Sequence, residues 1–113
     1  MTGIDVYRQV SSLLGIDPSS ETGSSDKVLL SNVLSTTNRV LADLTDYKTS
    51  ITKLSDEITL SDTVLESIPY GVAMFLLLQR GDRERYNIFA DLYSKKRARA
   101  KNVITRIKQS NGI

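Results

Sequence analysis

The sequence predicts an all-α protein, a small helical bundle of four to five helices. Three observations favour this fold class. Apolar residues recur at helical spacings over most of the chain, and capping residues and glycines divide it into helix-sized segments. Only residues 48–60 are rich in the Thr and Ile that favour strands. The 113 residues fit one domain, so we expect residues 1–113 to fold around a single core.

The first two helices are predicted on either side of a polar loop. Residues 3–14 have apolar positions at helical spacing, and Thr2 and Asp5 match a capping box with Asp in place of Glu. Residues 17–25, with Pro, Gly and four Ser, are typical of a loop. The second helix is expected from about Ser25 onward. Its apolar stripe is Leu30, Leu34, Thr37, Leu41 and Leu44.

Residues 48–60 change character, because Thr and Ile replace the helical pattern. Ser55 and Asp56 are typical turn residues. The sequence therefore predicts either a short β-hairpin, about residues 50–54 paired with 57–60, or an extended connector.

The next segment contains Pro69. Ser61 is expected to cap a short helical turn that ends near Glu66. Because proline is disfavoured inside a helix and favoured at its first position, we expect a break before Pro69 and a new helix from there to Arg80. Apolar residues at 72–78 cover every face of this helix, so it is predicted to be the buried centre of the fold.

A long final helix, about residues 83–109, is predicted after Gly81 and Asp82. Gly81 ends the preceding helix and Asp82 caps the final one, which explains the integrin-like tripeptide Arg80-Gly81-Asp82 as capping residues. The apolar stripe of the final helix is Tyr86, Phe89, Tyr93, Ala100, Val103 and Ile107. The core residues predicted for the whole domain are Leu34, Leu41, Val72, Phe75, Leu76, Phe89 and Tyr93.

Charge is distributed unevenly along the chain. From Leu92 to the C-terminus there are seven basic residues and no acidic one, whereas the other 91 residues hold 8 basic and 13 acidic residues. Such asymmetry is typical of binding to an acidic protein surface or to nucleic acid. The predicted partner-binding residues are Lys95, Lys96, Arg97, Arg99, Lys101, Arg106 and Lys108.

The basic block has more than one interpretation. It can be a solvated helix face, or its charges can be compensated by DNA phosphate or by an acidic protein groove. Lys96 interrupts the apolar stripe between Tyr93 and Ala100. Either its stem lies along apolar surface with the ammonium reaching out, or the stripe leaves the core at that point and the helix projects.

Composition argues against catalysis and metal binding. Without Cys and His the chain lacks disulfides, thiol nucleophiles, the usual zinc ligands and the commonest general base. Asp43 with Asp46, and Asp56 with Glu57, are interpreted as solvated charge rather than carboxylate sites. We therefore expect no enzyme activity, no cofactor and no metal. The longest apolar run, at 72–78, is too short for a membrane span of about 20 residues, and no secretory leader is visible.

Several patterns together resemble a known family. Residues 51–60 form an Ile/Thr segment with acidic residues, followed by Leu65-x-x-Ile68-Pro69-x-Gly71 leading into an apolar helix. A Gly-Asp break at 81–82 precedes Arg85-x-x-x-Phe89-x-x-x-Tyr93 and a basic helix. Mainly over residues 50–100, the chain resembles the head–tail connector, or adaptor, proteins of tailed bacteriophages.

This resemblance implies a structural virion protein at the head–tail interface, assembled in the host cytoplasm. Members of the family are small helical bundles that form a ring, commonly of twelve copies, beneath the portal protein. The ring extends the channel through which double-stranded DNA passes and presents a platform for a stopper or tail-completion protein. Residues 95–108 would then dock on the portal or face the channel. No membrane is involved.

A different class of function also fits the basic helix. A small helical nucleic-acid-binding protein could use residues 95–108 on phosphates. Residues 69–80 and 83–109 could even mimic a helix-turn-helix, with Arg83 and Arg85 at the start of the second helix. That helix is too long, however, and Phe89 lies on its apolar face, where a recognition helix would be polar.

Overall fold

Four helices make up the fold in the computed structural model. They are α1 (Gly3–Leu14), α2 (Ser24–Thr45), α3 (Asp62–Arg80) and α4 (Arg83–Asn111). The structure describes the backbone of residues 1–16 and 24–111 and the side chains of residues 1–16 and 28–103. Most of the predicted loop at 17–25 therefore lies outside the described residues.

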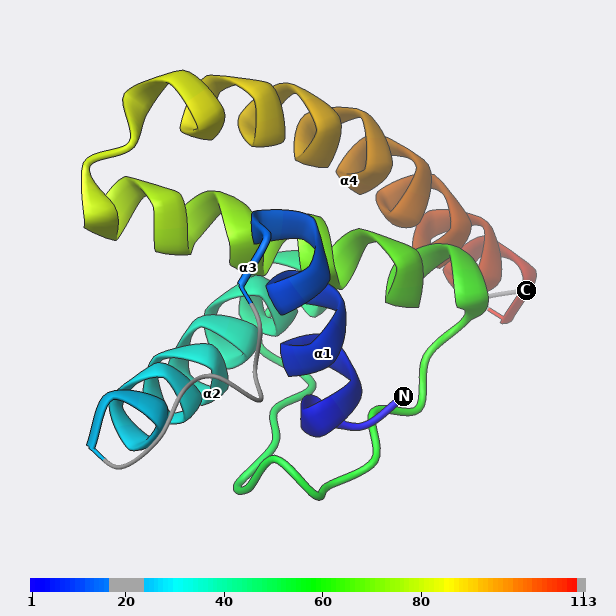
Figure 1. The fold of residues 1–113 in the computed structure, drawn as a ribbon. Helices are drawn as coiled ribbons and strands as arrows, with labels where there is room; N and C mark the ends of the chain where they lie inside the picture. The colour runs from blue at the N-terminus through cyan, green and yellow to red at the C-terminus, as the bar shows by residue number, and fades with distance from the viewer. Residues whose placement is uncertain (17–23, 112–113) are drawn as a thin grey trace.

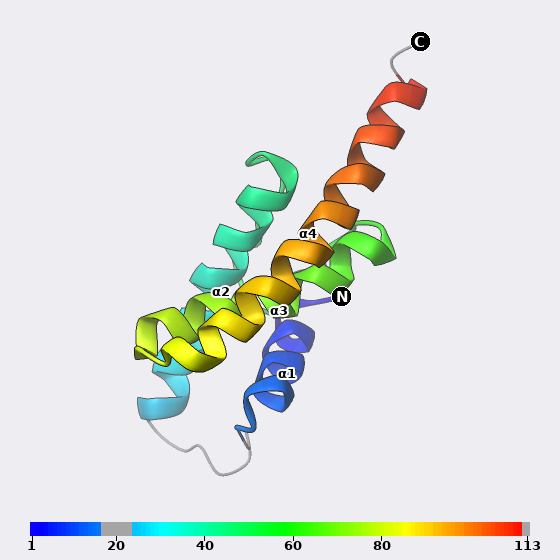
Figure 2. The same cartoon turned by 90° about the horizontal axis from the view of Figure 1, so that it is seen from above.

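The helix α3 lies at the centre of the bundle. Figure 1 shows α4 packed along one side of α3, after the tight turn at the left of the view, and α1 and α2 on the other side. The molecule is elongated, with extents of 52 × 30 × 18 Å. The last turns of α4 extend beyond the other three helices at one end (Figure 2). None of the described helices is both long and apolar enough to span a bilayer.

The N-terminus of α1 forms as the sequence predicts. The Thr2 hydroxyl accepts a hydrogen bond from the Asp5 N–H at 3.2 Å, and the Asp5 carboxylate accepts one from the Thr2 N–H at 2.9 Å. This reciprocal pair satisfies two of the backbone donors that a helix start leaves open. The predicted limits, residues 3–14, agree with α1.

Residues 48–60 form an irregular connector rather than a β-hairpin. The predicted turn is present, since the Asp56 carboxylate accepts hydrogen bonds from the N–H groups of Thr52 and Lys53. The backbone on either side of this turn bonds elsewhere. The Asn38 side chain bonds both the N–H and the carbonyl of Ile51, and residues 54–58 bond residues 1–4. Because these backbone groups already have partners, the segments on the two sides of the turn do not form a ladder of hydrogen bonds with each other.

The predicted break before Pro69 is wrong, because α3 runs without interruption from Asp62 to Arg80. The expected short helix and the following one are therefore a single element, and the described chain has four helices. Proline inside a helix costs about 3 kcal/mol. Val64, Ile68, Pro69 and Val72 are all fully buried, so burial of this face outweighs the missing hydrogen bond.

The predicted core is mostly internal. Leu41, Val72, Leu76, Phe89 and Tyr93 are buried, whereas Leu34 and Phe75 are only partly buried and pack at the margin of the core. The expectation that every face of residues 72–78 is buried does not hold at Leu78, which is 52% exposed. Only α1, α2 and α4 cover α3, and one stripe near its C-terminal end remains open to solvent.

The helices α2, α3 and α4 come into close contact at Gly71. A Cβ atom placed there would lie 2.7 Å from Cε1 of Tyr93 on α4 and 2.9 Å from Cγ2 of Val40 on α2. Both distances are too short for carbon atoms, so the missing side chain lets three helices meet. This contact fixes the distance between α2 and α4 on the face described next.

Candidate functional site

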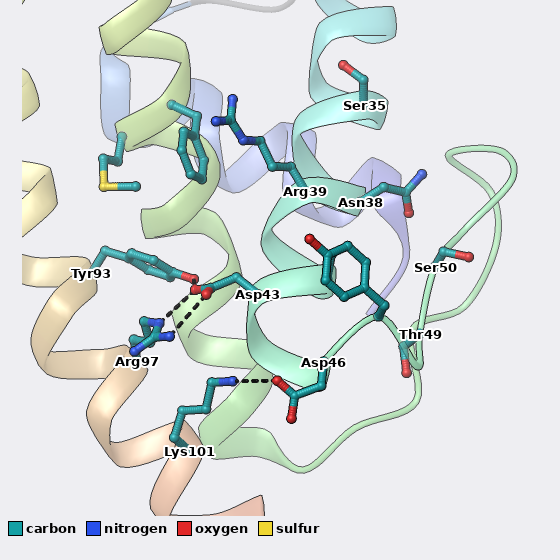
Figure 3. Close-up of a pocket in the computed structure, with 14 residues that line it drawn as sticks. Ser35, Asn38, Arg39, Asp43, Asp46, Thr49, Ser50, Tyr93, Arg97 and Lys101 are labelled. Carbon is teal, nitrogen blue, oxygen red and sulfur yellow. Dashed lines mark hydrogen bonds and ion pairs between the residues drawn. The ribbon is translucent and has the colours of Figure 1, made fainter.

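An open groove of about 1040 Å³ lies along the exposed face of α2 and reaches α4 (Figure 3). Met74 and Phe75 of α3 and the middle of α4 line one side of it, and residues 47–50 after α2 line the other. The lining side chains are Ser35, Asn38, Arg39, Ala42, Asp43, Asp46, Tyr47, Thr49, Ser50, Tyr93, Arg97 and Lys101.

An ion pair joins α2 and α4 at the level of Asp43. The Arg97 guanidinium donates to both carboxylate oxygens, through Nε at 2.7 Å and Nη2 at 3.1 Å. The Tyr93 hydroxyl donates to Oδ2 of the same carboxylate at 2.8 Å. Such charge-assisted, two-pronged contacts fix geometry as well as adding energy.

The environment of this cluster shifts three pKa values in a consistent way. The Arg97 hydrogen bonds hold the pKa of Asp43 below its usual range, and the same contact raises the pKa of Arg97. Burial, followed by the hydrogen bond to Asp43, raises the pKa of the Tyr93 phenol. Asp43 and Arg97 are therefore charged and Tyr93 is neutral at physiological pH.

A second ion pair lies one helical turn further along. Lys101 Nζ is 3.4 Å from Oδ1 of Asp46. Acidic side chains near the C-terminal end of a helix are unfavourable, because the helix dipole is negative there. Asp43 and Asp46 occupy this end of α2, and Arg97 and Lys101 compensate them from α4.

The turn after α2 presents an aromatic ring to solvent. Asp46 and Tyr47 both have left-handed backbones, with φ of 52° and 65°. The Tyr47 side chain is 88% exposed at the rim of the groove. A left-handed backbone costs a non-glycine residue roughly 1–2 kcal/mol. Backbone hydrogen bonds hold the turn, from Tyr47 N–H to the Ala42 carbonyl and from Lys48 N–H to the Thr45 carbonyl.

Arg39 is the remaining charged side chain of the groove. Its guanidinium carbon lies 4.3 Å from the centre of the Phe75 ring, a cation–π geometry. Among the described residues it has no ion-pair partner. Arg39 is thus an exposed cation oriented by an aromatic face, whereas Arg97 and Lys101 are neutralised by α2.

The structure divides the predicted basic residues among several environments. Arg97 and Lys101 line the groove, and Lys95 pairs with Asp91 on α4 at 3.1 Å. The Lys96 ammonium lies 4.6 Å from the centre of the Tyr70 ring. Arg99 is exposed and has no ion pair within the described part of the chain, and the side chains of Arg106 and Lys108 lie outside it. Carboxylates of the same chain therefore neutralise part of the positive charge of the basic block.

The position of Lys96 decides between the two interpretations of the apolar stripe. Ala100, the next stripe residue, is fully buried. The stripe therefore stays in the core past Lys96, and the interpretation that the helix leaves the core there is wrong. Lys96 is half-buried, with its ammonium over Tyr70, which is the stem-along-the-surface arrangement.

Sequence reasoning missed the α2 side of the groove. Asp43 and Asp46 were interpreted as solvated charge, but both are ion-paired to α4. The sequence did contain a signal for these ion pairs. Asp43 and Asp46 are three residues apart at the end of a helix where the dipole disfavours acidic side chains, and Arg97 and Lys101 are four residues apart on another helix. The sequence contained no comparable signal for Tyr47 and Arg39, because the exposure of a side chain and its backbone angles cannot be read from the spacing of residue types.

Within the described side chains no group of three or more His, Cys, Asp or Glu residues could hold a metal ion. A second, smaller hollow of about 280 Å³ lies at the turn between α3 and α4, lined by Leu77, Leu78 and Tyr86 among others. Comparison of the chain with protein-family models, curated proteins and solved structures finds no match.

Proposed function

We propose that this protein is a structural virion component, a head–tail connector of the tailed-bacteriophage type. In this role it forms a ring, commonly of twelve copies, between the portal and the stopper or tail proteins, and the ring extends the DNA channel. Its work is done by surfaces, with no chemical step. The sequence patterns at 51–71 and 81–93 support this function, as does an all-helical bundle with a long C-terminal helix.

The observation that carries the proposal is the division of the basic helix α4. Arg97 and Lys101 are used inside the chain by the carboxylates of α2, whereas Arg99 is exposed without an ion pair among the described residues. Figure 2 shows the end of α4 extending past the rest of the bundle, where it is accessible to another protein. An exposed helix end that continues a packed core suits docking on a portal.

The alternative is a nucleic-acid-binding protein. Internal pairing weakens it, because Arg97 and Lys101 would have to leave Asp43 and Asp46 before they could contact phosphate. Affinity for DNA grows with the number of phosphates neutralised, so each cation already paired lowers the expected affinity and its salt dependence. Within the described side chains of the basic block, Arg99 is the exposed cation that has no ion pair or cation–π contact and is left for this function.

The test is a measurement of mass in solution by light scattering, with the protein alone and mixed with a candidate portal ring at moderate salt. We expect the protein to co-migrate with the portal at a fixed ratio, which gives the copy number. Arg99→Glu should weaken this complex. Arg83→Glu, an equally exposed position at the other end of α4, is the matched control and should leave the complex intact.

A different result would contradict the connector function. A protein that stays monomeric in the presence of the portal, yet retards duplex DNA with a steep salt dependence, would replace the connector function by nucleic-acid binding. In that case Arg99→Glu should flatten the slope of log affinity against log salt.

A further inference from the structure

We infer that the groove along α2 is a docking site for an acidic segment of a partner protein. The segment places an aliphatic or aromatic side chain on Phe75 and against Tyr47, and a neighbouring carboxylate on Arg39. The inference rests on the proposed function only for the identity of the partner, which would be a neighbouring virion protein. The groove chemistry itself is independent of that identity.

Tyr47 offers an exposed aromatic ring to a partner. Its ring is 88% exposed and its φ is 65°, so the residue gives up backbone preference without burying its side chain in the fold. The left-handed turn ends α2 through backbone hydrogen bonds to the carbonyls of Ala42 and Thr45, and it leaves this ring in solvent at the rim of the groove. Tyrosine is also enriched among the residues that dominate interface energies, because it offers a rigid apolar surface and a polar tip.

The charge of the groove favours an acidic ligand. Of the charged side chains in the groove, Asp43 and Asp46 are paired with Arg97 and Lys101, and Arg39 is left with only the Phe75 ring. The unpaired charge of the groove is therefore positive and oriented. A guanidinium that contacts only an aromatic ring has N–H groups available for a carboxylate, which it can bind through two parallel hydrogen bonds.

The size and shape of the groove favour a segment of chain over a small molecule. A volume of about 1040 Å³ slightly exceeds the roughly 300–1,000 Å³ typical of small-molecule sites, and the groove opens to solvent. That shape suits a chain segment. Nucleic acid fits poorly, because Arg39 is the one groove cation that has no ion pair among the described residues, and affinity for nucleic acid grows with the number of phosphates neutralised.

The probe for the test is a display library of short random peptides, selected on the intact protein. We expect enrichment of sequences that carry Asp or Glu close to an aliphatic or aromatic residue. A fluorescently labelled selected peptide should then lose at least about tenfold in affinity with Arg39→Ala and with Tyr47→Gly. The matched controls outside the groove are Arg83→Ala and Ile88→Ala, both exposed, which should bind as the unchanged protein does.

Each other outcome overturns the inference. These are no enrichment, enrichment of peptides without acidic residues, or binding that survives both groove variants. Duplex DNA that binds through Arg39 would assign the groove to nucleic acid instead. Unfolding curves of both variants guard against loss of fold, and Arg39→Lys, which keeps the charge, should retain part of the affinity. Failure here leaves portal co-migration untouched, so the groove and the connector function fail separately.

Discussion

Replacing Gly71 by Ala tests whether close helix packing sets the distance between α2 and α4. In a free helix this change stabilises by about 1 kcal/mol, because glycine is a poor helix former. Here the new Cβ would lie 2.7 Å from Tyr93 and 2.9 and 3.0 Å from the two Cγ atoms of Val40, whereas ordinary contacts begin near 3.4 Å. Neither neighbour can move away cheaply. Val40 is fully buried, and Tyr93 is held by its hydrogen bond to Asp43.

The expected result is net destabilisation. Overpacking of a core costs about 1–3 kcal/mol, and three contacts at or below 3.0 Å place this site at the upper end. After the gain in helix propensity, Gly71→Ala should lower the free energy of unfolding by about 2 kcal/mol. For a domain of this size that is a fall in Tm of about 8 °C. Urea unfolding followed by far-UV circular dichroism measures the change.

Two further variants make the result interpretable. Val40→Ala is destabilising by itself, because it leaves a cavity, but it makes room for the new methyl group. The cost of Val40→Ala should therefore shrink by at least about 1 kcal/mol when Gly71→Ala is present. Ser94→Ala on the exposed face of α4 is the control for helix propensity alone and should be neutral or slightly stabilising. A Gly71→Ala protein as stable as the original, with no coupling to Val40, would refute this account of the packing.

Three other variants probe the groove and the first helix. Tyr47→Gly should raise the free energy of unfolding by about 1 kcal/mol in urea titration, because glycine accepts a φ of 65° that tyrosine resists; a loss of stability would mean that the ring supports the fold. Asp43→Asn should cost about 1 kcal/mol at pH 7, after allowance for the partial exposure of the Arg97 pair. Since the folded pKa of Asp43 is depressed, this contribution is present above the ordinary carboxyl pKa and is lost as pH falls through the folded value. The difference between the two proteins should therefore shrink in acid unfolding curves, and a constant difference would contradict it. Thr2→Ala should cost about 1 kcal/mol by removing the capping box with Asp5, measured as a fall in Tm; an unchanged Tm would show that Asp5 alone caps α1.

Local signals in the sequence predicted the helices well where one physical cause acted alone. The limits of α1 follow from a capping box and a terminal glycine, and the turn between α3 and α4 follows from Gly81 and Asp82. The prediction was wrong at Pro69, where two causes compete. Proline opposes a helix locally, but burial of the flanking residues against the rest of the bundle favours it, and that burial is not visible in a local pattern.

The connector at 48–60 was ambiguous for a similar reason. Its turn could be read from Ser55 and Asp56, but the partners of its backbone could not. Those partners are the side chain of Asn38, far away in α2, and residues 1–4 at the chain start. A hairpin and a docked connector place the same residues in the same turn, and only the tertiary fold decides which groups receive the hydrogen bonds.

The groove illustrates the same limit for function. Counting charges correctly identified α4 as basic, but a count along the chain treats every cation as free. In the fold Arg97 and Lys101 are held by two carboxylates of α2, and the unpaired cation of the groove is Arg39, which lies outside the basic block altogether. The net charge of a segment therefore pointed to a binding helix without indicating which of its residues, or of its neighbours, can meet a partner.

Local preference and observed structure agree at the helix caps of the described chain and disagree at Pro69, in the 48–60 connector and at the end of α2. Helix caps, glycines at tight turns and apolar stripes all favour the conformations that the chain adopts. At the end of α2 the pattern reverses, with two carboxylates against the helix dipole and an exposed tyrosine in a left-handed backbone. Natural sequences give up local consistency mainly at functional or strained sites. Backbone hydrogen bonds within the chain stabilise the turn at Tyr47, but the fold leaves its ring 88% exposed, so the ring is the part of this turn that a partner bound at the groove would cover.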